Sequence, residues 1–201
     1  MIAIIDYDAG NLKSVSKALE WLGEEAVITR DDQAILSADR VVLPGVGSFG
    51  AAMEQLKKYG LDRTIREAVQ RQIPFLGICL GLQLLFEGSE ESGGVEGLGI
   101  LKGRILKIPE ADGLKIPHIG WNALTLQHQG RLFEGIADQA FVYFVHSYYL
   151  QAEEDQIVKA KTEYGVQIHA SVECGQVFAC QFHPEKSSSV GLAILKNFAA
   201  V

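Results

Sequence analysis

The chain has 201 residues, of which 48% are hydrophobic and 21% charged, a composition and length typical of one compact domain with a sizeable core. The net charge of -7 and the lack of any Lys/Arg-rich run argue against a nucleic-acid-binding face. The excess of acidic over basic residues bears on solubility and does not indicate a function.

The first hundred residues alternate between short apolar runs and amphipathic segments. The apolar runs predict buried strands over residues 2–5, 26–29, 40–45 and 74–78. The amphipathic segments predict helices over residues 12–22, 50–58 and 61–72 and from residue 80 onward, with Asn11 capping the first helix and Gly23 ending it. Strands that are apolar on both faces and alternate with helices predict a mostly parallel sheet with helices on both faces.

After about residue 100 the pattern changes to strand-like segments with few helices between them. These segments are GRILKI, WNALTL, FVYFVHSYYL, QIVKAKT, VQIHASV and QVFACQF. They predict antiparallel strands joined to the parallel sheet, followed by a last helix over residues 188–199. Since no linker, low-complexity tract or repeat divides the chain, we expect a single α/β domain over residues 1–201.

Targeting signals and disulfides are not expected. The first residues, MIAIIDYDAGN, lack the basic region of a signal peptide, and no apolar run approaches the roughly 18 residues that a membrane span needs. The three cysteines are widely spaced and odd in number, so they do not form a disulfide framework. We therefore expect a cytoplasmic protein in a reducing setting.

The segment PFLGICLGLQLLFEG, residues 74–88, places a cysteine between a predicted strand and a predicted helix. Around Cys79, the glycines at 77 and 81 fit a sharp strand-to-helix turn, because residues two before and two after a nucleophile on such a turn come close together. The start of the helix would stabilise a thiolate, and the N–H of Leu80 would face an oxyanion. The alternative is an ordinary buried cysteine at a strand end.

The segment CQFHPEKSSS, from residue 180, supplies a candidate base. Pro184 disfavours helical angles at the residue before it, and in an extended segment His183 and Glu185 would face the same way. Glu185 would accept a hydrogen bond from one imidazole nitrogen and leave the other to face Cys79. The alternative for this segment is a solvated turn at the end of a strand. Cys180 and His183 have the spacing of a pair of metal ligands, but no second pair has ligand spacing, so we expect no metal site.

Longer segments carry a family resemblance. PFLGICLGLQLLFEGSEE and QFHPEKS together resemble the triad, or class I, glutamine amidotransferase family. IIDYDAGN, LPGVGSFG, PHIGWN and YFVHSYY narrow the resemblance to the glutaminase subunits of imidazole glycerol phosphate synthase, in histidine biosynthesis, and span nearly the whole chain. The resemblance implies a glutamine amidotransferase type-1 domain over residues 1–201. One departure is Asp8, where a glycine is expected, in a loop that is not catalytic in the family.

The resemblance implies hydrolysis of L-glutamine to glutamate and ammonia, without a cofactor. Cys79 would attack the amide carbon to form a thioester, and His183, oriented by Glu185, would protonate the ammonia and then activate water. A second oxyanion donor would come from the loop Pro44–Gly47. There, Gly45 and Gly47 would let the peptide at Val46 rotate, so we expect this donor to be absent until the loop flips.

Further residues are candidates for substrate binding. Gln83 lies four residues after Cys79, so on a helix its amide would lean over the turn, and the resemblance gives it a substrate-binding role. The alternative for Gln83 is an ordinary surface position. Ser147 and Tyr148 resemble residues whose backbone holds the amino-acid end of the substrate. We expect purely structural roles at four other positions. His118 and His146 would position loops, and Cys174 and Cys180 would be buried thiols.

The chain is too short to hold a synthase domain and has no Gly-x4-Gly-Lys phosphate loop. The resemblance implies transfer of ammonia to a (βα)8-barrel cyclase subunit in a heterodimer, which makes imidazole glycerol phosphate and aminoimidazole carboxamide ribotide. Trp121, Asn122 and Lys186 are the candidates for the docking face, since tryptophan is favoured at interface hot spots. The alternative for Trp121 is a core position.

Two other interpretations stay open. One is a glutaminase subunit of a different synthase, in anthranilate or nucleotide biosynthesis, with the same chemistry and another partner. The other is a non-catalytic binding or regulatory module on the same fold. The complete set of Cys79, His183 and Glu185 argues against the second interpretation, and only the narrower motifs argue against the first.

Overall fold

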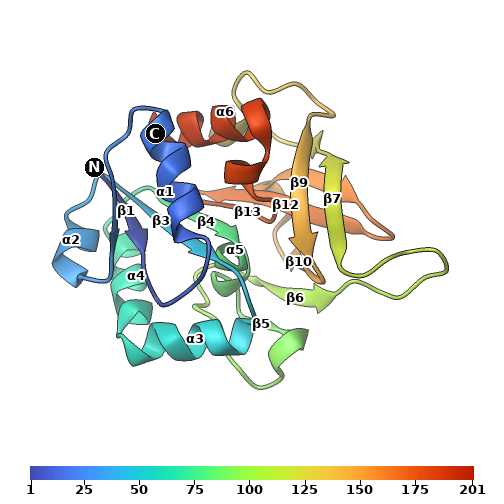
Figure 1. Cartoon of the computed structure of the whole chain (residues 1–201). Coiled ribbons are helices and arrows are strands. Elements are labelled where there is room, and N and C mark those ends of the chain that lie inside the picture. Colours follow the sequence, from blue (N-terminus) through green and yellow to red (C-terminus); the bar gives the residue numbers. More distant parts are fainter.

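A computed structural model, which describes all 201 residues, has an eight-stranded mixed sheet at its centre (Figure 1). Its strand order is β2-β1-β3-β4-β13-β12-β11-β8. The bounds are β1 (Ile2–Ile5), β2 (Ala26–Thr29), β3 (Arg40–Gly45), β4 (Phe75–Cys79), β8 (Thr125–Leu126), β11 (Val158–Glu163), β12 (Gln167–Cys174) and β13 (Val177–Cys180). Pairing is parallel from β2 to β13 and antiparallel from β13 to β8. The predicted junction between a parallel and an antiparallel half is therefore confirmed.

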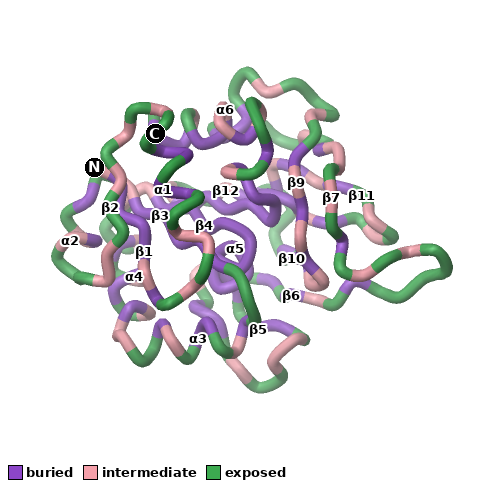
Figure 2. The backbone as a smooth tube through the Cα atoms, viewed as in Figure 1, coloured by how far each residue is buried: buried purple, intermediate pink, exposed green.

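Helices cover both faces of this sheet. They are α1 (Leu12–Trp21), α2 (Asp32–Leu36), α3 (Phe49–Lys58), α4 (Leu61–Gln70), α5 (Leu80–Leu84) and α6 (Ser188–Ala199). Ile2 and Ile4 of β1 pack in the core under α1 and α6, whereas Ala3 and Ile5 pack in the core with α3 and α4. Because alternate residues of a strand point to opposite faces, an all-apolar strand is what a sheet buried on both sides requires (Figure 2).

Two smaller sheets lie beside the antiparallel half. One has the order β10-β6-β5, and the other pairs β7 with β9 antiparallel. Their bounds are β5 (Gly88–Ser89), β6 (Gly103–Lys107), β7 (His118–Ala123), β9 (Phe141–His146) and β10 (Tyr148–Ala152). The apolar run FVYFVHSYYL therefore divides at Ser147 into strands of two different sheets. In Figure 1 the β7/β9 ribbon lies on the side of the molecule away from α2.

Two local predictions are wrong, the capping bond of Asn11 and the burial of Cys174. The helix predicted from residue 80 is present with a length of five residues, and α2 was not predicted. Asn11 occupies the cap position of α1 with a left-handed φ of 73°, but its side chain makes no capping hydrogen bond. Cys174 is exposed because it ends β12 at a hairpin turn, whereas Cys180 is buried as predicted. No helix has the length and hydrophobicity to cross a membrane.

Candidate active site

Cys79 stands at a sharp turn, as the last residue of β4 and directly before α5. Its φ of 55° and ψ of -109° form a backbone conformation that L-residues rarely adopt. A Cβ on Gly77 would lie 2.7 Å from the carbonyl oxygen of Gly81, and a Cβ on Gly81 would lie 1.9 Å from that of Leu43. The chain therefore has the close approach that the glycine spacing predicts, and neither position has room for a side chain.

Cys79 is 7% exposed, and its side chain faces a hollow of about 320 Å³. Gln181 Nε2 donates to Sγ at 3.7 Å, and Val145 O lies 3.8 Å from Sγ. The hollow is lined by Val46, Gly47, Cys79, Leu80, Gln83, Glu91, Pro117, Val145, Ser147, Tyr148, His183 and Lys186. A small ligand can therefore reach the thiol, and many of the sequence-predicted site residues surround the same space.

His183 and Glu185 meet beside this hollow, with His183 Nδ1 2.8 Å from Glu185 Oε1. Their contact arises from a 3-10 turn over Pro184–Lys186, not from the extended segment that the sequence suggested, and β13 already ends at Cys180. Burial lowers the pKa of His183, but hydrogen bonds and charge interactions with Cys79 and Glu185 raise it by more, to about 9. The geometry thus favours a protonated imidazole between a sulfur and a carboxylate.

The loop between β1 and α1 also reaches this site. Asn11 Nδ2 donates to Glu185 Oε1 at 2.5 Å, so the asparagine predicted to cap a helix holds the acid instead. Tyr7 OH donates to Pro44 O at 3.0 Å, at the start of the predicted oxyanion loop. Sequence reasoning missed both contacts. The available signal was the IIDYDAGN motif, which the family resemblance included but to which no chemistry was assigned.

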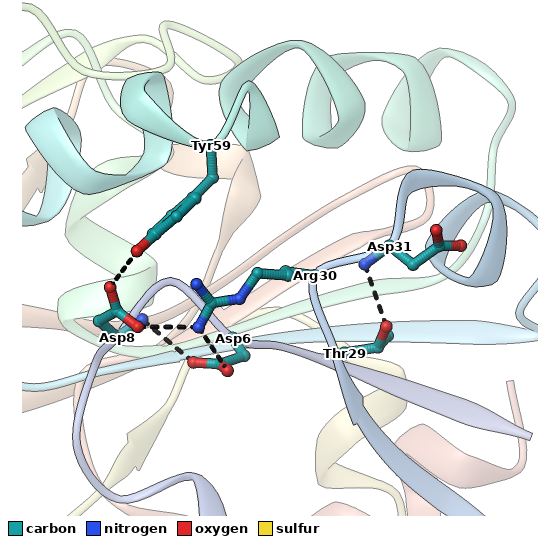
Figure 3. Close-up of polar contacts among 6 residues, drawn as sticks. All are labelled: Asp6, Asp8, Thr29, Arg30, Asp31 and Tyr59. Atoms are coloured by element: carbon teal, nitrogen blue, oxygen red, sulfur yellow. Dashed lines mark hydrogen bonds and ion pairs between the residues drawn. The ribbon is translucent and has the colours of Figure 1, made fainter.

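An ion-pair network holds the outer side of the same loop (Figure 3). Asp8 has a left-handed φ of 64°, which explains why glycine is expected at this position. Arg30 Nη2 lies 2.7 Å from Asp6 Oδ2 and 2.8 Å from Asp8 Oδ1, and Tyr59 OH donates to the other oxygen of Asp8. The hydrogen bonds from Tyr59 and Arg30 lower the pKa of Asp8. The network therefore fixes a loop conformation that is unusual for aspartate.

The predicted oxyanion residues lie around the sulfur. Gly45 is the register partner of Cys79 between β3 and β4, and Val46 and Gly47 follow it into the wall of the hollow. Val46 is 40% exposed, and Gly47 has a φ of +104° with no atom within 4 Å of an added Cβ. Leu80, at the start of α5, lines the hollow as well. The loop thus has open space around its second glycine.

Gln83 is buried and lies inside the site, which excludes the surface alternative. Its Nε2 donates to Tyr148 O and to Gln181 Oε1, both at 3.1 Å. Gln181 is fully buried and was missed by sequence reasoning, although a glutamine two residues before His183 within an apolar run is an available signal. Ser147 and Tyr148 line the hollow where β9 gives way to β10. No group of three or more His, Cys, Asp or Glu side chains could hold a metal ion.

Comparisons with known proteins identify the family. The model of the class-I glutamine amidotransferase family matches residues 3–201. The imidazole glycerol phosphate synthase subunit HisH of Methanocaldococcus jannaschii is 50% identical over 198 residues, which cover 98% of each chain. The HisH subunit of Aquifex aeolicus is 51% identical over 196 residues, which cover 97% of this chain and 94% of that one. The chain belongs to the class-I glutamine amidotransferase family, among its HisH members.

Solved structures agree on the class-I glutamine amidotransferase fold. PurLQS from Thermotoga maritima has a TM-score of 0.76 at 21% identity, covering 99% of this chain and 97% of that one. The glutaminase domain of CTPS from Trypanosoma brucei has a TM-score of 0.71 at 17% identity, covering 99% of this chain and 93% of that one. At these identities the likeness establishes the fold alone, and the predicted fold class is confirmed.

In this HisH-family chain, the three residues predicted to meet a partner differ in exposure. Trp121 is 51% exposed, so it is not a core residue, and with Ile119 at 60% and Phe141 at 56% it forms an apolar surface that we call the ribbon patch. Lys186 is exposed at the rim of the hollow. Asn122 instead points inward, where its Nδ2 donates to Glu163 O at 2.9 Å. Two of the three are therefore available at the surface, and Asn122 acts within the chain.

Proposed function

We propose that the chain is the glutaminase subunit of an imidazole glycerol phosphate synthase and that residues 1–201 act as one glutamine amidotransferase domain. It hydrolyses L-glutamine to glutamate and ammonia for histidine biosynthesis. The observation that carries the proposal is a strained, ligand-accessible Cys79 beside a bonded His183–Glu185 pair, in a chain about half identical to HisH subunits over its length. Cytoplasm is the proposed setting, since all three thiols are free.

Acylation uses the charge state of the site. Because Cys79 and Glu185 raise the pKa of His183 to about 9, the ring can hold the proton that the Cys79 thiol gives up as it attacks. The Cys79 thiolate attacks the side-chain amide carbon of glutamine and forms a tetrahedral intermediate. The N–H of Leu80 stabilises its oxyanion, and a second donor comes from the peptide at Val46 after the loop rotates about its glycines. Each such donor is worth about 3–4 kcal/mol, or roughly a hundredfold to a thousandfold in rate.

His183 then moves the protons. Imidazolium protonates the departing nitrogen as the C–N bond breaks, which leaves a glutamyl thioester on Cys79 and neutral ammonia. The neutral imidazole next takes a proton from water, whose oxygen attacks the thioester and releases glutamate. Glu185 holds the ring orientation throughout by accepting from Nδ1, and Asn11 holds Glu185. Gln83 and the backbone of Ser147 and Tyr148 bind the rest of the substrate.

The ammonia is used by a second protein. Ammonia released into water is mostly protonated and then no longer a nucleophile, so direct transfer to a second site favours the reaction. The acceptor that we propose is a (βα)8-barrel cyclase subunit, bound in a heterodimer over the mouth of the hollow. The ribbon patch and Lys186 support this placement, because exposed Trp and other aromatic side chains are favoured at interface centres.

The test is glutamine hydrolysis measured with and without the barrel cyclase and its ribotide ligand. We expect strong stimulation by the complete complex and no hydrolysis by a Cys79→Ala variant in the same complex. Stimulation only by the partner of an anthranilate or nucleotide synthase would replace the proposed pathway. A wild-type chain that fails to hydrolyse glutamine with any partner would contradict the glutaminase assignment.

A further inference from the structure

Two buried histidines face each other on the inner side of the β7/β9 ribbon. His118 and His146 are register partners, and His118 Nδ1 lies 2.9 Å from His146 Nε2. They are 2% and 6% exposed. His118 also stacks on Phe144 and Tyr164, with ring centroids 4.8 Å and 3.9 Å apart. The glutaminase mechanism uses neither imidazole, so the pair needs a separate explanation.

The hydrogen-bond directions in this pair are determined by their neighbours. His146 Nδ1 lies 2.9 Å from Tyr148 O, and because a carbonyl only accepts, this nitrogen carries the proton. Burial lowers the pKa of His118 to about 4 and that of His146 to about 3, so both rings are neutral at pH 7. His146 Nε2 is therefore an acceptor, and His118 Nδ1 donates to it. His118 Nε2 in turn accepts from Asn122 Nδ2 at 3.4 Å.

The chain of hydrogen bonds continues to the sulfur. Tyr148 O accepts from His146 and also from Gln83 Nε2 at 3.1 Å. The same amide of Gln83 donates to Gln181 Oε1, and Gln181 Nε2 donates to Cys79 Sγ at 3.7 Å. A continuous series of polar contacts therefore runs from Asn122 on β7 to the nucleophile, and every side chain between them is buried.

One end of this series lies next to the ribbon patch, and the other end lies at the hollow over Cys79. Asn122 is adjacent to Trp121 of the ribbon patch, and alternation along β7 turns one residue outward and the next inward. At the other end, Val145 and Ser147 flank His146 and line the hollow over Cys79. The outer face of the ribbon and part of the wall of the hollow are therefore formed by the same two strands.

We propose that Asn122, His118 and His146 are positioning residues that couple the ribbon patch to the turn holding the amino-acid end of glutamine. The identity of substrate and partner in this inference rests on the proposed function. When the partner displaces β7, the His118–His146 bond transmits the shift to the Tyr148 carbonyl. That carbonyl sets both the Ser147–Tyr148 turn and the Gln83 amide, so docking adjusts substrate binding without either imidazole touching the substrate.

Substitutions at His118 test the inference in the cyclase complex. His118→Phe keeps a flat ring between Phe144 and Tyr164 but removes both hydrogen bonds, and we expect about a tenfold rise in KM for glutamine with a smaller change in kcat. His118→Asn restores a donor near the Nδ1 position and should recover most of the KM. The matched control is Tyr164→Phe, which keeps the stacking on His118, loses the hydroxyl bond to Lys115 O and should leave KM within about twofold.

A double-mutant cycle separates coupling from general loosening. Asn122→Ala should raise KM in the wild-type background, and it should have little further effect in His118→Phe, because its action passes through that ring. Fully additive effects would overturn the inference, as would a KM for His118→Phe equal to that of wild type. Thermal unfolding shows which variants fold, and the cycle can be closed with His118→Asn if His118→Phe does not.

A measurement independent of turnover keeps this inference distinct from the proposed function. Nitrogen-15 NMR of the rings should show His118 and His146 neutral and protonated at Nδ1, with both signals shifting when the cyclase binds. This result would support the coupling even if the complex proved to act on another amide. An Nε2–H form of either ring, or signals that do not respond to the bound cyclase, would overturn it.

Discussion

The molecule has two buried histidine sites with opposite protonation. His183 and His118 are both 2% exposed, and His146 is 6% exposed. The pKa of His183 is nevertheless raised to about 9, whereas the pKa values of His118 and His146 are lowered to about 4 and about 3. Glu185 and Cys79 face the first ring, and the second site has a backbone carbonyl, an amide and the other ring.

The comparison shows that burial is the main cause of the lowered pKa at His118 and His146, with His118 and His183 adding to it at His146, and that a negatively charged partner reverses the effect at His183. At His183 the protein keeps a proton available for transfer. At the His118–His146 pair it keeps a neutral ring whose donor and acceptor sides are fixed, which suits positioning. The same residue type therefore has two protonation states in neighbouring parts of the molecule, and changing the partners should interconvert their pKa shifts.

Glu185→Gln should have the largest effect on the difference in protonation between His183 and the His118–His146 pair. The amide keeps the shape of the carboxylate but removes its charge, so the pKa of His183 should fall and the ring should lose its fixed orientation. We expect kcat for glutamine to drop by about a thousandfold to ten-thousandfold, as when the acid of a comparable triad is removed. Steady-state hydrolysis in the cyclase complex measures this, with the exposed Glu25→Gln as the matched control. A loss of less than tenfold would contradict the assigned role of Glu185.

The pH dependence of stability should show the two sites with opposite signs. The raised pKa of His183 contributes stability that is present below pH 6.5 and lost as pH rises through about 9. The lowered values at His118 and His146 contribute stability that is present above pH 6.5 and lost as pH falls toward about 4 and about 3. Each group changes the free energy of unfolding by about 1.4 kcal/mol per pH unit at most.

Urea unfolding across this pH range measures the loss of stability at high pH, which we call the alkaline limb, and the loss at low pH, which we call the acid limb. Glu185→Gln should flatten the alkaline limb and leave the acid limb in place, and His118→Phe should reduce the acid limb only. If His118→Phe left the acid limb unchanged, the His118–His146 pair would not be neutral in the folded protein, and the hydrogen-bond directions assigned to it would be wrong.

Asn11→Gly should have an intermediate effect on the charged site. Glycine accepts the left-handed φ of 73° without strain, so the fold should be retained, but Glu185 loses the donor at 2.5 Å. We expect kcat to fall about tenfold, as is typical of one lost hydrogen bond to a charged group. Steady-state kinetics should therefore show a lower kcat, whereas thermal unfolding should show a Tm close to that of wild type. Equal kcat values for Asn11→Gly and wild type would show that the contact with Glu185 does not contribute to catalysis.

Asp8 should give the smallest effect, because its network is exposed and lies outside the site. Asp8→Gly removes the contacts to Arg30 and Tyr59 and also relieves the left-handed backbone, so we expect Tm within about 2 °C of wild type. Asp8→Ala keeps the unfavourable backbone and should lower Tm by a further 2–4 °C, roughly. A Gly variant less stable than the Ala variant would contradict this account.

The sequence predicted the parallel half of the sheet and the Cys79 turn well, because both depend on local patterns. Continuous apolar runs mark strands buried on both faces, and the spacing of Gly77 and Gly81 follows from steric contacts within a few residues. The division of FVYFVHSYYL at Ser147 was not visible, since both halves are equally apolar and only tertiary pairing separates them.

The polar interior of the site was the least predictable part. The bonds from Asn11 to Glu185, Gln181 to Cys79 and Asn122 to His118 join residues whose partners are set by the fold rather than by spacing. The proximity of His183 to Glu185 was anticipated for the wrong reason, because a 3-10 turn replaced the extended segment. Roles assigned to these residues in catalysis remain predictions for the experiments above.

The backbone angles at Cys79 place the sequence under opposing demands. A positive φ of 55° is tolerated best by glycine, so stability alone would favour glycine at this position. The turn also needs glycine at residues 77 and 81, where an added Cβ would lie 2.7 Å and 1.9 Å from backbone carbonyl oxygens. The nucleophile that we propose therefore lies where stability and reactivity conflict, and a glycine at this position should give a more stable protein that lacks the thiol.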